Sequence, residues 1–338
     1  MVLRAPWELV PDEVSRPPLD PSQVLVRVTH SGICGTDYKI YSGAIPVSYP
    51  RVMGHEMAGE VVDAGSAGAL RPGDRVIIDP QLYCGACFHC RIGQTHLCPN
   101  GMLIGRDTNG GFAEFVAAPA NHVFGLPDSI DSRTAPLIQV LTTCLHAQQQ
   151  IHISPGEAVV VFGLGVTGQL HVQLAKARGA SPVIGVTRSA DKRALAQELG
   201  ADLTIPGDER AIERVREATA GRGADVVIET TGMLPSVSSA IHMARSGGRL
   251  LLFGIITAKE GALPFYDLYF KELALIGARV AKSEDYPAAI ALVESGKVRL
   301  EPLVSNVMPL ADLKAAVGML GPGSADSGPR MKIILDHS

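Results

Sequence analysis

Hydrophobic and polar residues alternate over short stretches in the first 135 residues of the chain. Alternating runs at 24–28, 59–62 and 75–78 are separated by Gly, Pro and Asp, and residues 71–74 form a turn that leads into the last of these runs. Short strands between frequent turns are typical of a barrel-like β unit rather than a layered α/β one. We therefore predict a β-rich, irregular first domain.

A different pattern starts at residue 158, where continuous apolar runs alternate with stretches of helical spacing. Strands are predicted at 158–162, 182–186, 225–229, 249–253 and 273–277, and helices at 169–178 and about 191–199. Apolar parallel strands joined by helices are typical of a doubly wound sheet. We expect six strands in this sheet, with the last one at an open edge.

The pattern becomes less regular after residue 277. A helix from about residue 286 to 295 is followed by an apolar pair at 303–304 and a final strand at 331–335, which most simply returns to the first domain. The predicted fold class is α/β. Residues 1–140 and 282–338 would form the β-rich domain, and residues 141–281 the nucleotide-binding domain with its doubly wound parallel sheet.

Composition and charge limit the classes of partner. The 338 residues are 46% hydrophobic and 19% charged, which suits two globular domains. The formal net charge of -4 provides no basic face for nucleic acid or for an anionic membrane. The chain has neither an apolar run that could span a membrane nor a secretion signal at residues 1–6. We expect small-molecule partners, copies of the same chain and a cytoplasmic location.

Four of the six cysteines lie close together in the sequence, and this spacing indicates a metal site. They are Cys84, Cys87, Cys90 and Cys98. Four thiolates can close a tetrahedron around zinc and leave no position open for chemistry. Buried or disulfide-bonded cysteines are the alternative, but isolated core thiols would not recur at every third residue of a Gly-containing loop.

A second candidate metal site combines Cys34, His55 and Glu56, each close to a glycine. A thiol, an imidazole and a carboxylate suit a catalytic zinc ion that keeps one position open. Taken alone, a His-Glu pair is more often a hydrogen-bonded pair than a metal site. The other motifs of the chain favour the metal interpretation.

Residues 163–168 have the pattern Gly-x-Gly-x-x-Gly, directly after a predicted strand and before a helix. The glycines let the backbone approach a pyrophosphate, which binds at the helix N-terminus. We predict dinucleotide binding by this turn and by a glycine that follows a later strand. The predicted residues are Gly163, Gly165, Val166, Thr167, Gly168 and Gly254.

The end of the second strand predicts which dinucleotide binds. A carboxylate at this position would bind the ribose hydroxyls of NAD, whereas the chain has Thr187 and Arg188, with Lys192 and Arg193 one turn later. Cations without a neighbouring anion favour a 2′-phosphate, so NADP(H) is preferred over NAD(H). The alternative is that both cations form an ordinary solvated face and Thr187 only relaxes the specificity.

Taken together, the motifs have the order and spacing found in the zinc-dependent medium-chain alcohol dehydrogenases. The sequence resembles this family over essentially its whole length, and most of all the branch of polyol, sugar and threonine dehydrogenases. The resemblance implies a GroES-like catalytic domain, a Rossmann domain, one catalytic and one structural zinc ion, and a homodimer or homotetramer. The implied reaction is hydride transfer between NADP(H) and a secondary alcohol, polyol or sugar-like substrate.

The resemblance also implies roles for individual residues. Cys34 and His55 become zinc ligands, and Glu56 becomes a ligand or an alternating one. Asp37 would hold the His55 ring, a support that zinc-bound histidines generally have. Thr36 would pass the proton of the substrate hydroxyl outward.

The chain departs from the family at three positions. Gln139 stands where relatives place a charged zinc ligand, and a glutamine oxygen is a weaker one. Lys39 replaces the histidine that ends the proton relay. A lysine with the ordinary pKa of about 10.4 is a poor proton shuttle at neutral pH, so either its pKa is lowered or water takes over the relay. The alternative is that Lys39 simply faces solvent. Gly35 replaces a pyrophosphate-binding arginine, for which Lys332 or Arg330 would have to substitute.

Three alternatives stay open. The first is an NAD-dependent member of the family with the same chemistry. The second is a noncatalytic nucleotide-binding relative, which Gln139 favours and the retained Cys34, His55, Glu56 and Thr36 oppose. The third, a zinc-free quinone reductase, is less favoured because proteins of that kind lack both sets of metal ligands.

Overall fold

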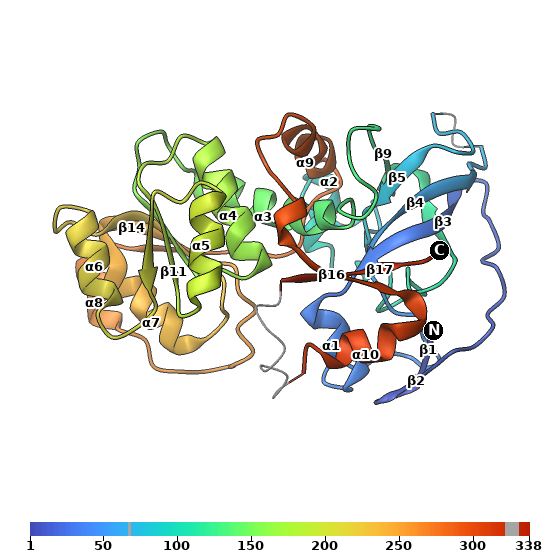
Figure 1. Cartoon of the computed structure of the whole chain (residues 1–338), viewed down its shortest axis with the longest axis horizontal. Coiled ribbons are helices and arrows are strands. Elements are labelled where there is room, and N and C mark those ends of the chain that lie inside the picture. The colour runs from blue at the N-terminus through green and yellow to red at the C-terminus, as the bar shows by residue number, and fades with distance from the viewer. Residues whose placement is uncertain (67–68, 322–330) are drawn as a thin grey trace. The chain divides into compact units, whose positions relative to one another are not determined.

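The computed structural model describes residues 1–66, 69–321 and 331–338, and it divides into two units (Figure 1). The first unit comprises Met1–Thr142, Lys282–Glu294 and Leu303–Ser338, and the second comprises Thr143–Ala281 and Ser295–Pro302. The division falls inside helix α3 (Leu137–Ile151). Among the described residues, no helix has the length and apolar character needed to cross a membrane.

The first unit is built on a seven-stranded sheet around β3 (Gln23–Gly32). β3 pairs antiparallel with β4 (Glu56–Asp63), β8 (Phe115–Pro119) and β17 (Lys332–Asp336). Alternate residues of β3, among them Val24 and Val26, are buried in one apolar cluster with residues of β4, β5 and β8. This arrangement explains the alternating sequence pattern, because only one face of each strand enters that core.

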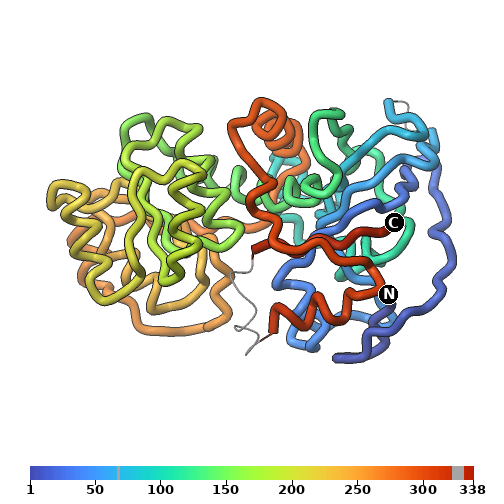
Figure 2. The backbone as a smooth tube through the Cα atoms, in the orientation of Figure 1, coloured from blue at the N-terminus to red at the C-terminus, as the bar shows by residue number. Residues whose placement is uncertain are grey.

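Smaller elements complete the first unit. They are β1 (Val2–Ala5), β2 (Glu8–Val10), α1 (Gly35–Tyr41), β5 (Arg75–Ile78), β6 (Gln81–Leu82), α2 (Phe88–Arg91), β7 (Met102–Leu103), β9 (Val123–Gly125), α9 (Asp285–Glu294), β16 (Val304–Pro309) and α10 (Leu313–Gly318). β17 lies between β16 and β3 in the sheet, so the last strand of the chain belongs to the first unit. Figure 2 shows this red segment and the blue N-terminal region in the same half of the molecule.

The second unit contains a parallel sheet with the strand order β12-β11-β10-β13-β14-β15. This is the order found in dinucleotide-binding folds. Its strands are β10 (Val159–Phe162), β11 (Val183–Thr187), β12 (Leu203–Pro206), β13 (Ala224–Glu229), β14 (Ala244–Leu252) and β15 (Ala274–Gly277). Its helices, besides α3, are α4 (Val166–Ala177), α5 (Ala190–Glu198), α6 (Ala211–Ala218), α7 (Leu234–Met243) and α8 (Phe265–Phe270).

Both faces of this parallel sheet are covered by helices. Val159 and Val161 pack in a cluster with α3 and α4, whereas Val160 between them packs in a second cluster with α6 and α7. A strand buried on both faces has no position for an exposed polar side chain, which is why its sequence is continuously apolar.

The structure locates a strand and a segment that the sequence pattern did not place. β12 (Leu203–Pro206) is the sixth strand of the parallel sheet, and its four residues give too short an apolar run to be recognised. Residues 295–302, predicted for the first domain, belong to the second unit instead. The Gln173 side chain explains this difference, because it accepts a hydrogen bond from Arg299 N at 2.7 Å and donates one to Arg299 O at 3.1 Å.

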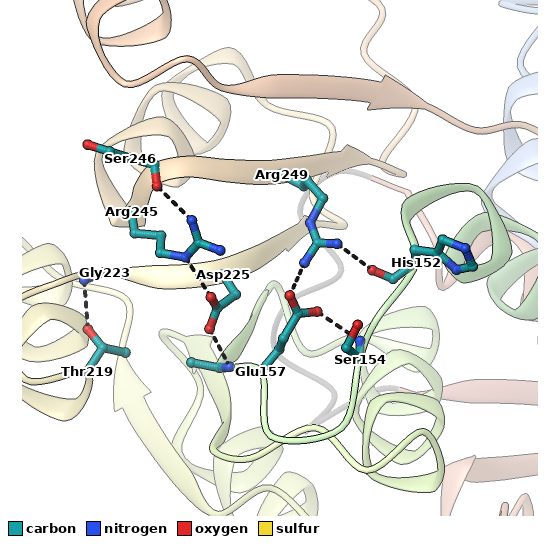
Figure 3. A network of polar contacts seen from close by, with 10 residues as sticks. His152, Ser154, Glu157, Thr219, Gly223, Asp225, Arg245, Ser246 and Arg249 are labelled. Carbon is teal, nitrogen blue, oxygen red and sulfur yellow. Dashed lines mark hydrogen bonds and ion pairs between the residues drawn. The ribbon is translucent and has the colours of Figure 1, made fainter.

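Two ion pairs hold the ends of the parallel strands opposite the glycine-rich turn (Figure 3). Arg245 donates to Asp225 at 2.6 Å, and Asp225 also accepts from Ala158 N at 2.8 Å. Arg249 is paired with Glu157 and donates to the His152 carbonyl at 2.9 Å. These contacts tie β10, β13 and β14 together at the end of the sheet opposite the glycine-rich turn.

Candidate active site and metal centres

Cys34, His55 and Glu56 meet at the end of β3 in the first unit. Cys34 follows β3 and precedes α1, while Glu56 begins β4 and is paired with Gly32 of β3. One ligand atom from each of the three residues lies within 4.8 Å of the other two. A thiol, an imidazole and a carboxylate at this separation can bind one divalent ion, so the residues fit a zinc site.

Asp37 links the cysteine to the histidine. Its Oδ2 accepts from Cys34 N at 2.8 Å, and its Oδ1 lies 3.3 Å from His55 Nδ1. Burial opposes the charge of both ligands, yet Asp37 raises the pKa of His55 well above its usual value, and His55 lowers the pKa of Cys34. The site therefore favours a thiolate beside a histidine whose far nitrogen is oriented by a carboxylate, as metal-bound histidines require.

Lys332 occupies a position that the sequence did not predict. Its ammonium donates to both carboxylate oxygens of Glu56, at 2.8 and 2.7 Å, and to the Ile33 carbonyl at 3.1 Å. Burial opposes this charge, but Glu56 and Cys34 raise the pKa of Lys332 above its usual value. Lys332 is thus committed to Glu56, and the suggestion that it substitutes for a pyrophosphate-binding arginine is wrong. Arg330, the other suggested substitute, lies outside the described residues.

The remaining predicted catalytic residues lie on two helices of the first unit. Thr36 and Lys39 are half-buried on α1, and neither side chain has a hydrogen-bond partner among the described residues. Gln139 is half-buried in the first turn of α3, where its carbonyl accepts from Thr142 at 2.6 Å. As a metal ligand, the side-chain oxygen of Gln139 is uncharged and would not balance the charge of the ion.

The four cysteines of the second predicted site come together in a lobe formed by α2 and the loops around it. Sγ separations are 3.4 Å for Cys87–Cys90, 3.8 Å for Cys87–Cys98 and 3.5 Å for Cys84–Cys98. A tetrahedron of thiolates around zinc has edges of about 3.8 Å for Zn–S bonds of about 2.3 Å. The backbone N–H groups of Ala86 and Cys87 also lower the pKa of Cys84 to about 6, which favours the thiolate. The cluster therefore fits a structural zinc ion.

Cys144, the sixth cysteine, is excluded from both clusters. It is fully buried on α3, and its Sγ lies 3.8 Å from the Thr167 carbonyl. Burial raises the pKa of this thiol, so it behaves as a small apolar residue, as predicted.

The glycine-rich turn between β10 and α4 fits a pyrophosphate. Gly163 has a φ of 98°, and a β-carbon at Gly168 would fall 1.9 Å from the Gly163 carbonyl oxygen. Gly165 differs from both, because a β-carbon there would meet no atom within 4 Å. Gly165 is the N-cap residue of α4, and it has no side chain that could bond to the free N–H groups of the first turn. Open space therefore lies at the N-terminus of α4, where these N–H groups attract anions. Val166 and Thr167 begin that helix.

A buried carboxylate supports the loops beside this turn. Glu229 at the end of β13 accepts from Thr231 N at 2.8 Å and from Gly232 N at 3.0 Å. Its carbonyl accepts from the amides of Phe253 and Gly254, both at 2.9 Å. A β-carbon at Gly254 would fall 2.1 Å from Gly232 N, so the two loops touch through their backbones. Sequence reasoning found Gly254 but not Glu229.

The adenosine end of the predicted nucleotide site is cationic. Thr187 ends β11, with Arg188 exposed and Lys192 half-buried on α5. Arg193 donates from Nη1 to the carbonyls of Thr187 at 2.9 Å and Arg188 at 2.7 Å. Its Nε and Nη2 have no partner among the described residues. This guanidinium is therefore fixed at the strand end with donors to spare.

Comparisons with known proteins assign the chain to a family. Residues 20–128 match the family model described as the alcohol dehydrogenase GroES-like domain, and residues 166–295 match the zinc-binding dehydrogenase model. The chain is 34% identical to 2-dehydro-3-deoxy-L-galactonate 5-dehydrogenase of Pseudoalteromonas atlantica over 87% of this chain and 86% of that one. It is 33% identical to sorbitol dehydrogenase of Halalkalibacterium halodurans over 90% of each chain.

The fold gives the same assignment. A crystal structure of a zinc-binding dehydrogenase from Sinorhizobium meliloti 1021, bound to NADP, superposes with a TM-score of 0.92. The two chains are 32% identical, and the match covers 99% of this chain and 98% of the other. The predicted pairing of a GroES-like domain with a Rossmann domain is confirmed. The chain belongs to the zinc-dependent medium-chain alcohol dehydrogenase family.

Proposed function

We propose that the protein oxidises a secondary hydroxyl of a polyol or sugar-derived substrate with NADP as the hydride acceptor, and reduces the corresponding carbonyl in reverse. The observation that carries this proposal is the buried cluster of Cys34, His55 and Glu56, supported by Asp37. A zinc-type dehydrogenase of this family acts on small molecules with a nicotinamide cofactor. The preference for NADP and the substrate class are the parts that need testing.

The residues of the first unit would divide the work as follows. Cys34 and His55 hold the zinc ion, with Gln139 and Glu56 as further oxygen donors within the same unit. Zinc supplies the Lewis acidity that lowers the pKa of a substrate hydroxyl. Thr36, whose hydroxyl has no partner among the described residues, takes the released proton and passes it toward Lys39 or water. The four-cysteine lobe holds a second zinc ion that maintains the fold.

The residues of the second unit would bind the dinucleotide. The pyrophosphate lies against Gly163, Gly165 and Gly168 at the start of α4, and Gly254 lines the neighbouring loop. Arg188, Lys192 and Arg193 surround the end of β11, where no carboxylate follows Thr187. A 2′-phosphate would find guanidinium donors there, and the carboxylate of this segment, Asp191, is exposed on α5. The NADP-bound relative supports the same choice.

Two relatives support a polyhydroxylated substrate. One is named for a deoxy sugar acid and the other for sorbitol, and both align with nearly the whole chain. Both names denote compounds with several hydroxyl groups. A reducing compartment such as the cytoplasm is part of the proposal, because the four lobe thiols must stay reduced to bind zinc.

A homodimer or homotetramer is supported by one surface of the second unit. Among the described residues, β15 pairs with β14 alone, so its other edge is open. The neighbouring helix α8 exposes Phe265, Tyr266, Tyr269 and Phe270, each 63–77% accessible. An open strand edge beside exposed aromatic rings favours self-association. Sedimentation of the wild type and of Leu275→Lys would test this, since a monomeric wild type would contradict it.

The experiment for the catalytic proposal is a cofactor and substrate screen on zinc-loaded protein. NADP and NAD are offered separately with secondary alcohols, linear polyols, sugar acids, aldoses and threonine, and nicotinamide absorbance is followed. We expect turnover with NADP on polyols or sugar acids. Cys34→Ala should abolish it and leave the zinc ion of the four-cysteine lobe in place.

The opposite outcome is equally informative. No turnover across the screen, together with a single zinc ion per chain that is insensitive to Cys34→Ala, would overturn the proposal. The protein would then be a nucleotide-binding member of the family whose catalytic site is lost, with Gln139 as the mark of that loss.

A further inference from the structure

Gln169, near the start of α4, is a buried side chain that joins two parts of the proposed nucleotide site. Its Nε2 donates to the Lys192 carbonyl at 2.8 Å and to the Leu164 carbonyl at 3.3 Å. Leu164 lies in the glycine-rich turn, and Lys192 lies in the first turn of α5. One amide group therefore bridges the backbone of the glycine-rich turn and the backbone of the helix that follows β11.

Fold stability gives little reason for a glutamine at this position. Gln169 is fully buried, and its Oε1 has no hydrogen-bond partner among the described residues. A buried acceptor without a partner is unfavourable, which offsets what the two donated bonds contribute. The orientation of the amide is still determined, because the reverse orientation would place Oε1 against two carbonyl oxygens. The side chain therefore keeps its bridge although its acceptor atom stays unpaired.

The first turn of α5 is held from two directions. Arg193 donates to the carbonyls of Thr187 and Arg188, which ties this turn to the end of β11. Gln169 ties the same turn to α4 through the Lys192 carbonyl. Of these two ties, that of Gln169 alone reaches the glycine-rich turn.

The other end of the bridge is also fixed by packing. The Leu164 side chain is buried, and it lies over Gly185 of β11, where a β-carbon would fall 3.0 Å from Leu164 Cδ1. A side chain enclosed in this way holds the backbone of the glycine-rich turn in place. Gln169 therefore connects two well-packed segments and sets the distance between them.

A cofactor with phosphates at both places gains from a fixed distance between them. The pyrophosphate of NADP would bind at the glycine-rich turn, the pyrophosphate subsite, and its 2′-phosphate at the end of β11 and the first turn of α5, the 2′-phosphate subsite. When both subsites already have the right separation, binding one group presents the other at a high effective concentration. When the separation fluctuates, the cost of ordering the protein opposes binding. NAD has no 2′-phosphate, so it depends less on this separation.

We propose that Gln169 is a positioning residue that sets the separation between the pyrophosphate subsite and the 2′-phosphate subsite, and thereby favours NADP over NAD. The inference rests on the proposed NADP-dependent function. Because the side chain is fully buried, it acts through the Leu164 and Lys192 backbones and not by contact with the cofactor. Cofactor preference then depends on a residue inside the fold as well as on the cations at its surface.

Titration calorimetry of the full chain tests this inference without relying on turnover. NADP and NAD are compared with two halves of the cofactor: 2′-AMP, which carries the 2′-phosphate alone, and nicotinamide mononucleotide, which carries one phosphate of the pyrophosphate. Gln169→Met removes the amide and keeps a side chain of similar length. We expect NADP to bind about tenfold more weakly, a usual strength of coupling between two sites, while both halves bind nearly as in the wild type. NAD should lose less affinity than NADP, so the preference for NADP falls.

Two further variants keep the test decisive. Gln169→Asn retains an amide that is too short to bridge both carbonyls, so it should give the same result even if Gln169→Met does not fold. Gln173→Met is the matched control, because Gln173 lies one turn later on α4 and also holds a distant backbone, that of Arg299, by two hydrogen bonds. Since that contact lies outside the nucleotide site, the ratio of NADP affinity to NAD affinity should not change in Gln173→Met.

The outcomes separate the inference from the function on which it rests. If Gln169→Met weakens 2′-AMP as strongly as NADP, the residue supports one subsite only, and the inference is overturned while the proposed function stands. Unchanged NADP affinity in Gln169→Met and Gln169→Asn, or an equal loss for NADP and NAD, would have the same meaning. A wild type that binds NAD as tightly as NADP would overturn the proposed cofactor preference, and the inference with it.

Discussion

Gly168 lies so close to Gly163 that a β-carbon at residue 168 would fall 1.9 Å from the Gly163 carbonyl oxygen. Contact of this kind fixes the first turn of α4 against the end of β10. Gly165, two residues after Gly163, faces open space instead. The two glycines therefore have different tasks, one in packing and one in leaving room for a ligand.

Alanine substitutions should separate these two tasks. Gly168→Ala forces backbone atoms apart and should lower the free energy of unfolding by about 1–3 kcal/mol and abolish nucleotide binding. Gly165→Ala should change stability by less than about 0.5 kcal/mol, because its φ of -70° is ordinary, and still weaken NADP binding. Thermal unfolding and cofactor titration measure both quantities. Equal losses of stability in the two variants would contradict the division of tasks.

Cofactor preference should depend on the residue that ends β11. Thr187→Asp places a carboxylate beside the expected 2′-phosphate, and like charges in contact cost several kcal/mol. We expect the ratio of kcat/KM for NADP to that for NAD to fall about tenfold or more. Asp191→Asn, which removes an exposed carboxylate from the first turn of α5, serves as the matched control. An unchanged ratio in Thr187→Asp would mean that this strand end does not contact the ribose.

The two kinds of cysteine should respond differently to substitution. Cys90→Ser should remove one zinc ion per chain and lower Tm, because three thiolates hold zinc less well than four. Cys144→Ala removes a thiol that lies in neither cluster, so the zinc content should stay constant. Metal analysis after dialysis against a mild chelator gives the answer. Zinc content that is unaffected by Cys90→Ser would rule out a structural ion in the lobe.

His171 should make the protein less stable in mild acid. The side chain is fully buried on α4, accepts from Gln148 Nε2 at 3.1 Å and lies edge-on to the Phe253 ring. Burial lowers the pKa of His171 from 6.5 to about 3, so the folded protein keeps it neutral while the unfolded chain protonates it below pH 6.5. Its contribution to stability is complete above pH 6.5 and is lost as the pH falls toward 3, by about 1.4 kcal/mol per pH unit.

The measurement is urea unfolding of the wild type and of His171→Gln between pH 7 and pH 4. The glutamine keeps a hydrogen-bonding group but does not titrate, so its stability should fall less steeply with acid. The other titrating histidines, such as the half-buried His337, are present in both proteins and cancel in the comparison. Parallel curves for the two proteins would show that His171 does not titrate on unfolding.

Local patterns were sufficient to predict most of the fold and both groups of candidate metal ligands. The strand at 75–78 has the observed bounds of β5, because alternating burial leaves a direct trace in the sequence. The four cysteines and the glycine-rich turn were equally clear, because their chemistry depends on residues close together in the chain. β12 was not predicted, because a strand of four residues that ends in proline is too short to show an alternating or continuous apolar pattern.

Contacts between distant segments could not be predicted. Nothing near Glu56 indicates that Lys332, 276 positions later, neutralises it. The sequence placed Arg193 near the end of β11 but did not show its anchoring, because that depends on the carbonyls to which it donates. The segment 295–302 was assigned to the wrong unit because its tie to Gln173 is a contact between side chain and backbone across 126 residues. The missing parts of the site are therefore those that tertiary structure alone brings together.

The position of β17 has a consequence for how the protein is made. In the sheet of the first unit, β17 lies between β16 and β3, although it follows the whole second unit in the chain. The second unit, apart from Ser295–Pro302, is complete by Ala281 and can fold during synthesis. β3 must wait with one edge unpaired until residues 332–336 are translated. The environment of Glu56 is therefore completed only after the second unit has been translated, when Lys332 reaches it.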